Sequence, residues 1–206
     1  MITQRTSTKE RALAASVEAS PIATVLTNPR LPDNPVIAAN PAFCALTGYP
    51  LSEIIGRNCR FLAGEGTEPW QTQLVRDAIA SLKPSLTELL NYRKDGSAFR
   101  NALLIAPLFD AHGEVEYFLG SQVEVGEGSA RPLVIRERRA SHLLQALSVR
   151  QREVLREMAA GHPNKQIAWR LSISEKTVKM HRGLLLQKLS VRTSADAIRL
   201  AVEAGL

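Results

Sequence analysis

The chain has 206 residues, of which 45% are hydrophobic, enough for a packed core in one large domain or two small ones. No apolar run approaches the roughly 20 residues of a membrane-spanning helix, and the first residues lack the apolar core of a signal peptide. We therefore expect a cytoplasmic protein with no membrane partner. Two cysteines cannot form a disulfide framework, and the four histidines show no metal-ligand spacing, so no metal site is predicted.

Charge is distributed unevenly along the chain. Residues 131–206 hold 15 Lys and Arg against 6 Asp and Glu, a net charge of +9, whereas residues 1–130 hold 11 against 14, a net charge of −3. This asymmetry favours a nucleic-acid-binding half beside a half that does not bind nucleic acid. The alternative at this stage is a merely basic surface.

The expected elements of the first half mix strands and helices. A helix over residues 9–18 precedes two short strands, 23–27 and 36–39, and glycines break a helical stretch over residues 41–82. Three longer strands follow, at residues 86–94, 98–109 and 114–125, and Asp95-Gly96 between the first two is a strong hairpin signal. The order predicts an α+β domain, with a five-stranded antiparallel sheet and helices on one face.

Small, flexible and proline residues cluster at residues 126–132, where we place the boundary between two domains. Everything after this boundary has helical patterning. We expect an N-terminal extension over residues 1–16, a sensor domain over 17–125, a linker with a helix over 126–146, and an all-α domain over 147–206. Within the last domain Ser148 opens a capping box, Asn164 and Ser174 are predicted to cap the next two helices, and Ser194 starts the final helix.

Four short strings in the first half carry a specific signal. They are Gly56-Arg57-Asn58-Cys59-Arg60-Phe61-Leu62, Asn91-Tyr92-Arg93-Lys94-Asp95-Gly96, Phe99-Arg100-Asn101 and Gly120-Ser121-Gln122. In their order and spacing, residues 17–125 resemble the light-oxygen-voltage (LOV) branch of the PAS domains. The resemblance implies a flavin mononucleotide (FMN) cofactor, and side chains themselves do not absorb blue light. It also implies that the sulfur of Cys59 bonds flavin carbon C4a after excitation, the cofactor carrying the chemistry and the protein orienting it.

The other residues that match family positions are polar. Arg60 and Arg76 match the family's phosphate-binding arginines, as a dianionic phosphate requires. Asn58, Asn91 and Asn101 would supply amides to the polar edge of the flavin ring, because an amide in a strand fit for burial is costly unless it is hydrogen-bonded. A solvated surface charge or an ordinary strand-edge amide is the alternative for each.

Gln122 is the residue that we expect to carry the signal, because its amide can flip when flavin N5 changes from acceptor to donor. A structural cross-strand amide is the alternative. Cys44 matches no family role and is interpreted as packing, and an inert buried thiol is the alternative for Cys59. Ala63 stands where the family usually has glutamine, so the lifetime of the adduct is not predicted.

Residues 147–206 resemble the LuxR/GerE-type helix-turn-helix. The match includes Leu147-Ser148, Arg150-Gln151-Arg152-Glu153-Val154-Leu155, Gly161, Asn164-Lys165-Gln166-Ile167-Ala168, Leu171, Ser174, Thr177-Val178-Lys179, His181 and Lys188-Leu189. The resemblance implies binding to double-stranded DNA. In the third helix Val178, His181, Leu185 and Leu189 share one face that should pack on the other helices.

The opposite face of the third helix offers lysines and a small residue, as a helix in the major groove requires. We assign possible base contacts to Lys176 and Lys179, and phosphate contacts to Lys165, Thr177 and Arg182. A solvated helix face is the alternative for each cation. The last helix is apolar on more than one side, and in this family it is the dimerising helix.

Together the two halves predict a blue-light-regulated transcription factor, not an enzyme. Our hypothesis is that the dark sensor sheet covers the last helix of a monomer, and that light frees a homodimer to bind DNA. Three alternatives are a flavin redox or ligand sensor without the adduct, a phosphorylation-controlled response regulator, and a flavoenzyme. Residues 1–130 show neither the acidic pocket of a receiver domain nor a dinucleotide-binding glycine motif.

Overall fold

The computed structural model describes residues 8–126 and 140–206. The first part contains one five-stranded antiparallel sheet in the order β2-β1-β5-β4-β3. Its strands are β1 (Ala23–Thr27), β2 (Val36–Ala39), β3 (Ser85–Tyr92), β4 (Ala98–Phe109) and β5 (Val115–Val125). The predicted α+β fold is confirmed, and its antiparallel sheet is not the parallel sheet of a receiver domain.

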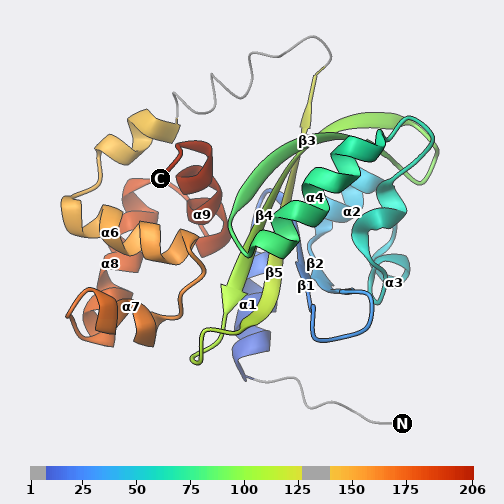
Figure 1. Cartoon of the computed structure of the whole chain (residues 1–206). Helices are drawn as coiled ribbons and strands as arrows, with labels where there is room; N and C mark the ends of the chain where they lie inside the picture. Colours follow the sequence, from blue (N-terminus) through green and yellow to red (C-terminus); the bar gives the residue numbers. More distant parts are fainter. Residues whose placement is uncertain (1–7, 127–139) are drawn as a thin grey trace.

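Four helical elements connect the second and third strands on one face of the sheet (Figure 1). They are α2 (Pro41–Thr47), α3 (Leu51–Ile54), the 3₁₀ helix η1 (Cys59–Leu62) and α4 (Pro69–Ser81). Asn40 begins α2, because its side chain accepts a hydrogen bond from the backbone N–H of Phe43. Gly48 ends α2 in the left-handed region with φ of 74°, a conformation that glycine adopts without steric cost.

The C-terminal part is all-α, as predicted. Residues 140–145 are helical and precede α6 (Val149–Ala159), α7 (Asn164–Arg170), α8 (Glu175–Lys188) and α9 (Ser194–Glu203). Ser148 forms the predicted capping box with Gln151, and Ser174 caps α8. The predicted linker helix falls partly on residues 127–139, which lie outside the described residues.

The prediction that Asn164 caps the second helix of this domain is wrong. Pro163 occupies the N-cap position of α7, and Asn164 is already helical. The side chain of Asn164 instead accepts a hydrogen bond from the guanidinium of Arg182 on α8. A tertiary contact therefore takes the amide that the local sequence pattern assigned to the cap.

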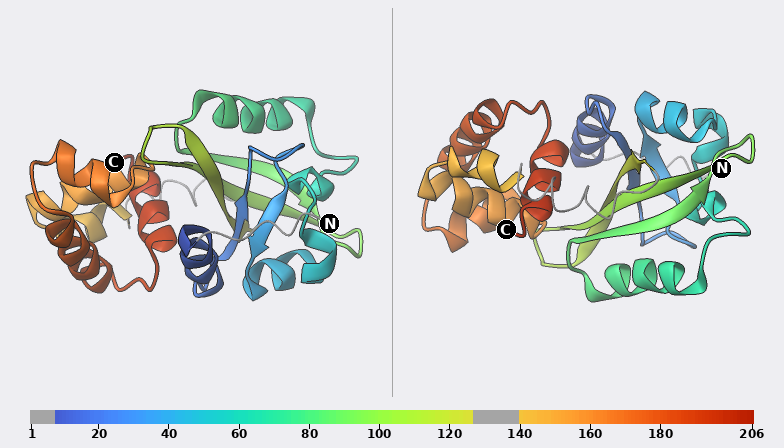
Figure 2. Two further views of the ribbon diagram at one scale, coloured as in Figure 1. Left: turned by 90° about the horizontal axis from the view of Figure 1, so that it is seen from below. Right: turned by 90° about the horizontal axis from the view of Figure 1, so that it is seen from above.

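The second face of the sheet is covered as well. Helix α1 (Thr8–Glu18) and the C-terminal helices lie against it, with α9 nearest to the strands (Figures 1 and 2). Side chains alternate between the two faces along each strand, so Asn101, Leu103 and Ile105 face α4 while Leu104 and Ala106 face the C-terminal domain. No helix within the described residues is long and apolar enough to cross a membrane.

Sheet, α1 and C-terminal domain share one continuous hydrophobic core. It includes Leu26, Leu104 and Leu119 from the sheet and Ile198 and Ala201 from α9. Gly161, in the turn after α6, approaches the end of β4 so closely that a Cβ there would lie 2.2 Å from the carbonyl oxygen of Pro107. The two domains are thus packed together and not merely tethered.

Candidate functional site

A cavity of about 350 Å³ lies between the inner face of the sheet and the elements η1 and α4. This volume is typical of small-molecule and cofactor sites, which span roughly 300–1,000 Å³. Its wall is mostly apolar, with a minority of amide, hydroxyl and guanidinium groups. All seven predicted cofactor residues line it: Asn58, Cys59, Arg60, Arg76, Asn91, Asn101 and Gln122.

Cys59 begins the 3₁₀ helix η1 at the wall of this cavity. The preceding residue, Asn58, fixes the start of η1, because its side-chain oxygen accepts from the N–H of Arg60 at 3.0 Å. The same amide donates to the carbonyl of Asp33 at 2.6 Å. Burial raises the pKa of Cys59 to about 12, so the group carries its proton at neutral pH and is a thiol, not a thiolate.

Four buried oxygen atoms around the cavity have no hydrogen-bond partner among the described residues. They belong to Thr27, Asn34, Asn101 and Gln122. Buried polar atoms are almost always paired, and four unpaired acceptors around one cavity indicate a ligand rich in hydrogen-bonding groups. The isoalloxazine ring and ribityl chain of a flavin are such a ligand, so the residues present fit the cofactor that the sequence implies. Thr27 and Asn34 were not predicted, because neither lies within the motif strings.

The two strand asparagines form a connected pair. Asn101 on β4 donates to the side-chain oxygen of Asn91 on β3 at 2.8 Å, and Asn91 donates to the carbonyl of Leu62 at 3.2 Å. These bonds leave the Asn101 oxygen facing the cavity without a partner. The pair therefore presents an oriented acceptor to the cavity and fastens β3 to η1.

The two predicted phosphate-binding arginines lie at the cavity rim and reach solvent. Arg60 pairs with Asp33 at 2.6 Å, and both side chains are more than half exposed. Arg76 on α4 is exposed and contacts Gln73. Exposed pairs of this kind are weak, so a phosphate can displace Asp33 from Arg60 at small cost.

Gln122 joins this cavity to the other domain. Its side chain is 3% exposed and its oxygen is unpaired beside the cavity. The adjacent residue on β5, Ser121, points its side chain to the opposite face. The carbonyl of Ser121 accepts a hydrogen bond from Arg199 of α9 at 3.0 Å. Neighbouring residues of one strand thus contact the cavity and the last helix.

A second bond fastens α9 to the sensor domain. The hydroxyl of Ser20 donates to the carboxylate of Asp196 at 2.7 Å, and both residues are buried. The other oxygen of that carboxylate accepts from the N–H of Thr193 in the capping box of α9. No local sequence pattern predicted these contacts.

The predicted DNA-contacting residues divide into two groups. Lys165, Lys176 and Lys179 are exposed on α7 and α8. Thr177 and Arg182 are engaged, since the Thr177 hydroxyl lies 2.8 Å from that of Ser174 and Arg182 donates to Asn164 and Ser194. In this arrangement the Arg182 side chain can reach a phosphate only after those bonds break.

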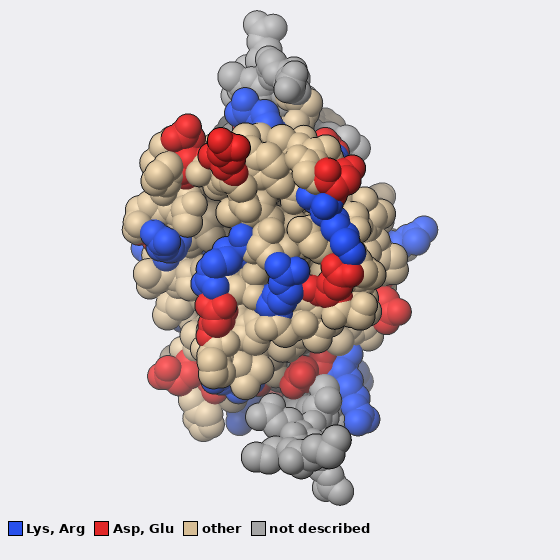
Figure 3. All heavy atoms as spheres, turned by 90° about the vertical axis from the view of Figure 1, so that its right-hand side faces the viewer, with Lys and Arg blue, Asp and Glu red and all other residues tan. Residues whose placement is uncertain are grey.

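Figure 3 shows the end of the sensor domain that faces away from the C-terminal helices, where basic and acidic side chains are interspersed. On the C-terminal domain, α7 and α8 carry three exposed apolar side chains, Trp169 at 78%, Met180 at 52% and Leu184 at 42% exposure.

Two family models match separate parts of the chain. A PAS domain model matches residues 21–127, just over half of the chain, and the model "Bacterial regulatory proteins, luxR family" matches residues 145–201. A blue-light-activated histidine kinase of Brucella canis is 42% identical over 146 residues, which is 70% of this chain. The match spans only 30% of that kinase.

Two solved structures resemble the sensor part. The light-state structure of the blue-light photoreceptor Aureochrome1 LOV is 40% identical with a TM-score of 0.53, covering 62% of this chain and 97% of that one. The LOV domain of the blue-light activated histidine kinase of Erythrobacter litoralis is 39% identical with a TM-score of 0.50, covering 52% and 98%. This chain therefore belongs to the PAS domain family, and it joins a domain of the LOV type to a C-terminal domain of the luxR family of bacterial regulatory proteins.

Proposed function

We propose that the protein is a blue-light-regulated DNA-binding transcription factor with FMN as its chromophore. The observation that carries the proposal is the arrangement on β5. The side chain of Gln122 faces the cavity with an unpaired oxygen, while the carbonyl of adjacent Ser121 is bonded to Arg199 of α9. A chemical change in the cavity can therefore reach the helix that holds the C-terminal domain in place.

Cys59 is the residue that reacts. Bound FMN would supply the absorption of blue light and an electrophilic ring carbon, and Cys59 at the cavity wall would supply the sulfur that bonds it and the proton that the ring takes up. Because the pKa of Cys59 is raised to about 12, the thiol brings that proton with it. Asn91 and Asn101 orient the polar edge of the ring, and Arg60 and Arg76 bind the phosphate.

Gln122 transmits the change. Its side-chain amide can donate or accept, depending on which end faces the ring. If a bound flavin changed the hydrogen-bonding character of the group that faces this amide, the amide would have to reorient, and the strain would fall on β5 and on the Ser121–Arg199 bond. Only a few kcal/mol of differential stabilisation is needed to change which of two domain arrangements predominates.

In the structure the two domains are packed together, which we call the closed arrangement, and most of α9 is buried. Ala195, Ile198 and Ala201 on this helix are 5% exposed or less. We propose that opening frees α9 to pair with its counterpart in a second copy, giving a homodimer that matches a two-fold DNA site, whereas the dark protein is a monomer. Lys176 and Lys179 would contact bases, and Lys165, with Thr177 and Arg182 once freed, would contact phosphates.

We expect the variant Gln122→Leu to separate photochemistry from output. Leucine is of similar size but cannot exchange donor for acceptor, so the flavin band should still bleach in light, while the light-induced gain in DNA affinity falls by roughly tenfold or more. Absorption spectra and DNA titrations of the same sample measure the two effects. Gln145→Leu, at an exposed position, serves as the control and should keep the full response.

The proposal as a whole is tested by absorption and DNA binding together. The purified protein should show a structured flavin absorption band at blue wavelengths, which bleaches on illumination and returns in the dark. DNA affinity should rise as the band bleaches and fall as it returns. Retention of light switching without bleaching would favour the flavin redox or ligand sensor. We propose no catalytic turnover, since the relatives named as kinases are matched over less than a third of their length.

A further inference from the structure

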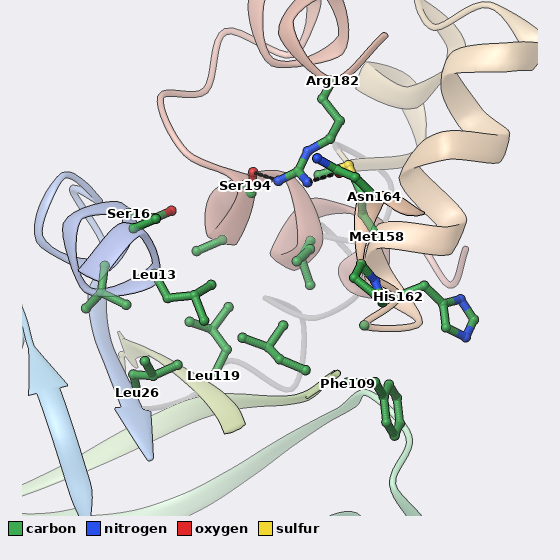
Figure 4. A pocket seen from close by; sticks show the side chains of 17 residues that line it. Leu13, Ser16, Leu26, Phe109, Leu119, Met158, His162, Asn164, Arg182 and Ser194 are labelled. Atoms are coloured by element: carbon green, nitrogen blue, oxygen red, sulfur yellow. Dashed lines mark hydrogen bonds between the residues drawn. The ribbon is translucent and has the colours of Figure 1, made fainter. Parts of the chain in front are cut away.

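A second cavity, of about 400 Å³, lies between the two domains. Its wall is divided between them, because α1 and the sheet supply one side and the C-terminal helices supply the other. Figure 4 shows Leu13, Ser16, Leu26 and Leu119 across from Met158, Asn164 and Arg182. The cavity exists only while the domains are together.

One end of this cavity is apolar and the other carries a single cation. Leu13, Val17, Leu26, Leu108, Leu119, Met158 and Ile198 form the apolar part. At the other end the guanidinium of Arg182 lies beside Asn164 and Ser194 (Figure 4). This polarity fits a ligand with one anionic head and an apolar tail.

The charge of Arg182 is not neutralised within the described part of the chain. Its two terminal nitrogens donate to a neutral amide and a neutral hydroxyl, and no ion pair to it is found among these residues. Desolvation lowers the pKa of Arg182, which shows that the cation is partly withdrawn from water without an anion to offset the loss. A guanidinium has five N–H donors, so donors remain for a carboxylate.

We propose that this interdomain cavity binds an amphipathic monocarboxylate, with its head on Arg182 and its apolar tail between α1, the sheet and α9. Such a ligand contacts both domains, so it binds the closed arrangement and stabilises it by mass action. Its effect on the light response rests on the function proposed above, whereas its binding in the dark does not. The carboxylate would then oppose the effect of light on DNA binding, because it stabilises the arrangement that light is proposed to open.

Binding is tested in the dark with the full-length flavin-loaded protein and sodium decanoate below its micelle concentration. Calorimetry should show saturable binding at one site per chain. Ser16→Phe, which places a ring in the cavity, should abolish it, while Ser52→Phe at an exposed position of α3 should leave it unchanged. Flavin absorption and thermal melting verify that each variant is folded.

The role of the cation is tested by comparing decanoate with decan-1-ol. Arg182→Gln should weaken decanoate binding by roughly tenfold or more and decan-1-ol binding by less than about threefold, because only the carboxylate makes a charge-assisted bond. The absence of saturable binding to the wild type, or binding that neither Ser16→Phe nor Arg182→Gln reduces, would refute the site.

Coupling to output is measured separately as DNA affinity in saturating light with and without decanoate. We expect saturating decanoate to weaken lit DNA binding at least about fivefold in the wild type and not in Ser16→Phe. Decanoate binding without this effect would refute the regulatory role. Equal lit and dark affinity in the ligand-free sample would count against the proposed light function and leave the dark binding result standing.

Discussion

Replacing Cys59 with alanine should abolish the light response while leaving the flavin bound. Among the described residues, Cys59 is the only cysteine that lines the cavity, and the other cysteine, Cys44, does not line it. The variant therefore has no sulfur that can bond the flavin. The reversible bleaching of the flavin absorption band, in which the band is lost in light and returns in the dark, should disappear. The ratio of lit to dark DNA affinity should fall to about 1, as measured by titration under continuous blue light.

Cys44→Ala is the matched control for this experiment. Cys44 is a half-buried thiol on α2 that packs against the core beneath β1 and β2. Its replacement should cost about 1 kcal/mol of stability and keep both the bleach and the DNA response. Light-switched DNA binding by Cys59→Ala would instead show that flavin redox chemistry, without a sulfur bond, drives the switch.

The variant Leu104→Lys should bind DNA in the dark almost as strongly as the illuminated wild type. Leu104 is fully buried on the sheet face that α9 covers, and it is the cross-strand neighbour of Ser121, whose carbonyl holds Arg199. A lysine there places an unpaired ammonium beside a guanidinium in the closed arrangement. In the open arrangement the same ammonium reaches water.

The expected size of this effect follows from the cost of burying a charge. Desolvation and repulsion together disfavour the closed arrangement by about 3 kcal/mol, which corresponds to roughly a hundredfold gain in dark DNA affinity. The photochemical cycle should persist, because Leu104 faces away from the flavin cavity. Leu51→Lys, at an exposed position of α3, is the control. A folded Leu104→Lys protein with weak dark binding would contradict the masking of α9.

The parts of the structure that the sequence predicted depend on local chemistry. Asp95-Gly96 predicts the hairpin between β3 and β4 because glycine adopts φ of 84° there without strain. Ser148 predicts the start of α6 because its side chain accepts from an N–H three residues later. The residues around the cofactor cavity could be predicted as well, since the motif strings hold six of the seven and the arginine matched on α4, Arg76, is the seventh.

The parts that the sequence did not predict depend on contacts between distant segments. Ser20 and Asp196 are 176 positions apart, and Ser121 and Arg199 are 78 apart. Nothing in the local periodicity of α9 distinguishes a face that packs on its own domain from one that packs on the sensor sheet. Asn164 failed as a predicted cap for the same reason, because Arg182 of another helix binds its side chain.

In the proposed mechanism, light weakens the contact between α9 and the sheet and so increases DNA affinity. The most direct test is a titration of one flavin-loaded sample with DNA, selected from a random pool by the illuminated protein, in darkness and under saturating blue light. We expect the dissociation constant to fall by roughly ten- to a hundredfold in light, and to recover as the flavin band recovers. Equal dissociation constants in the two states, in a sample whose flavin band bleaches fully, would contradict the account.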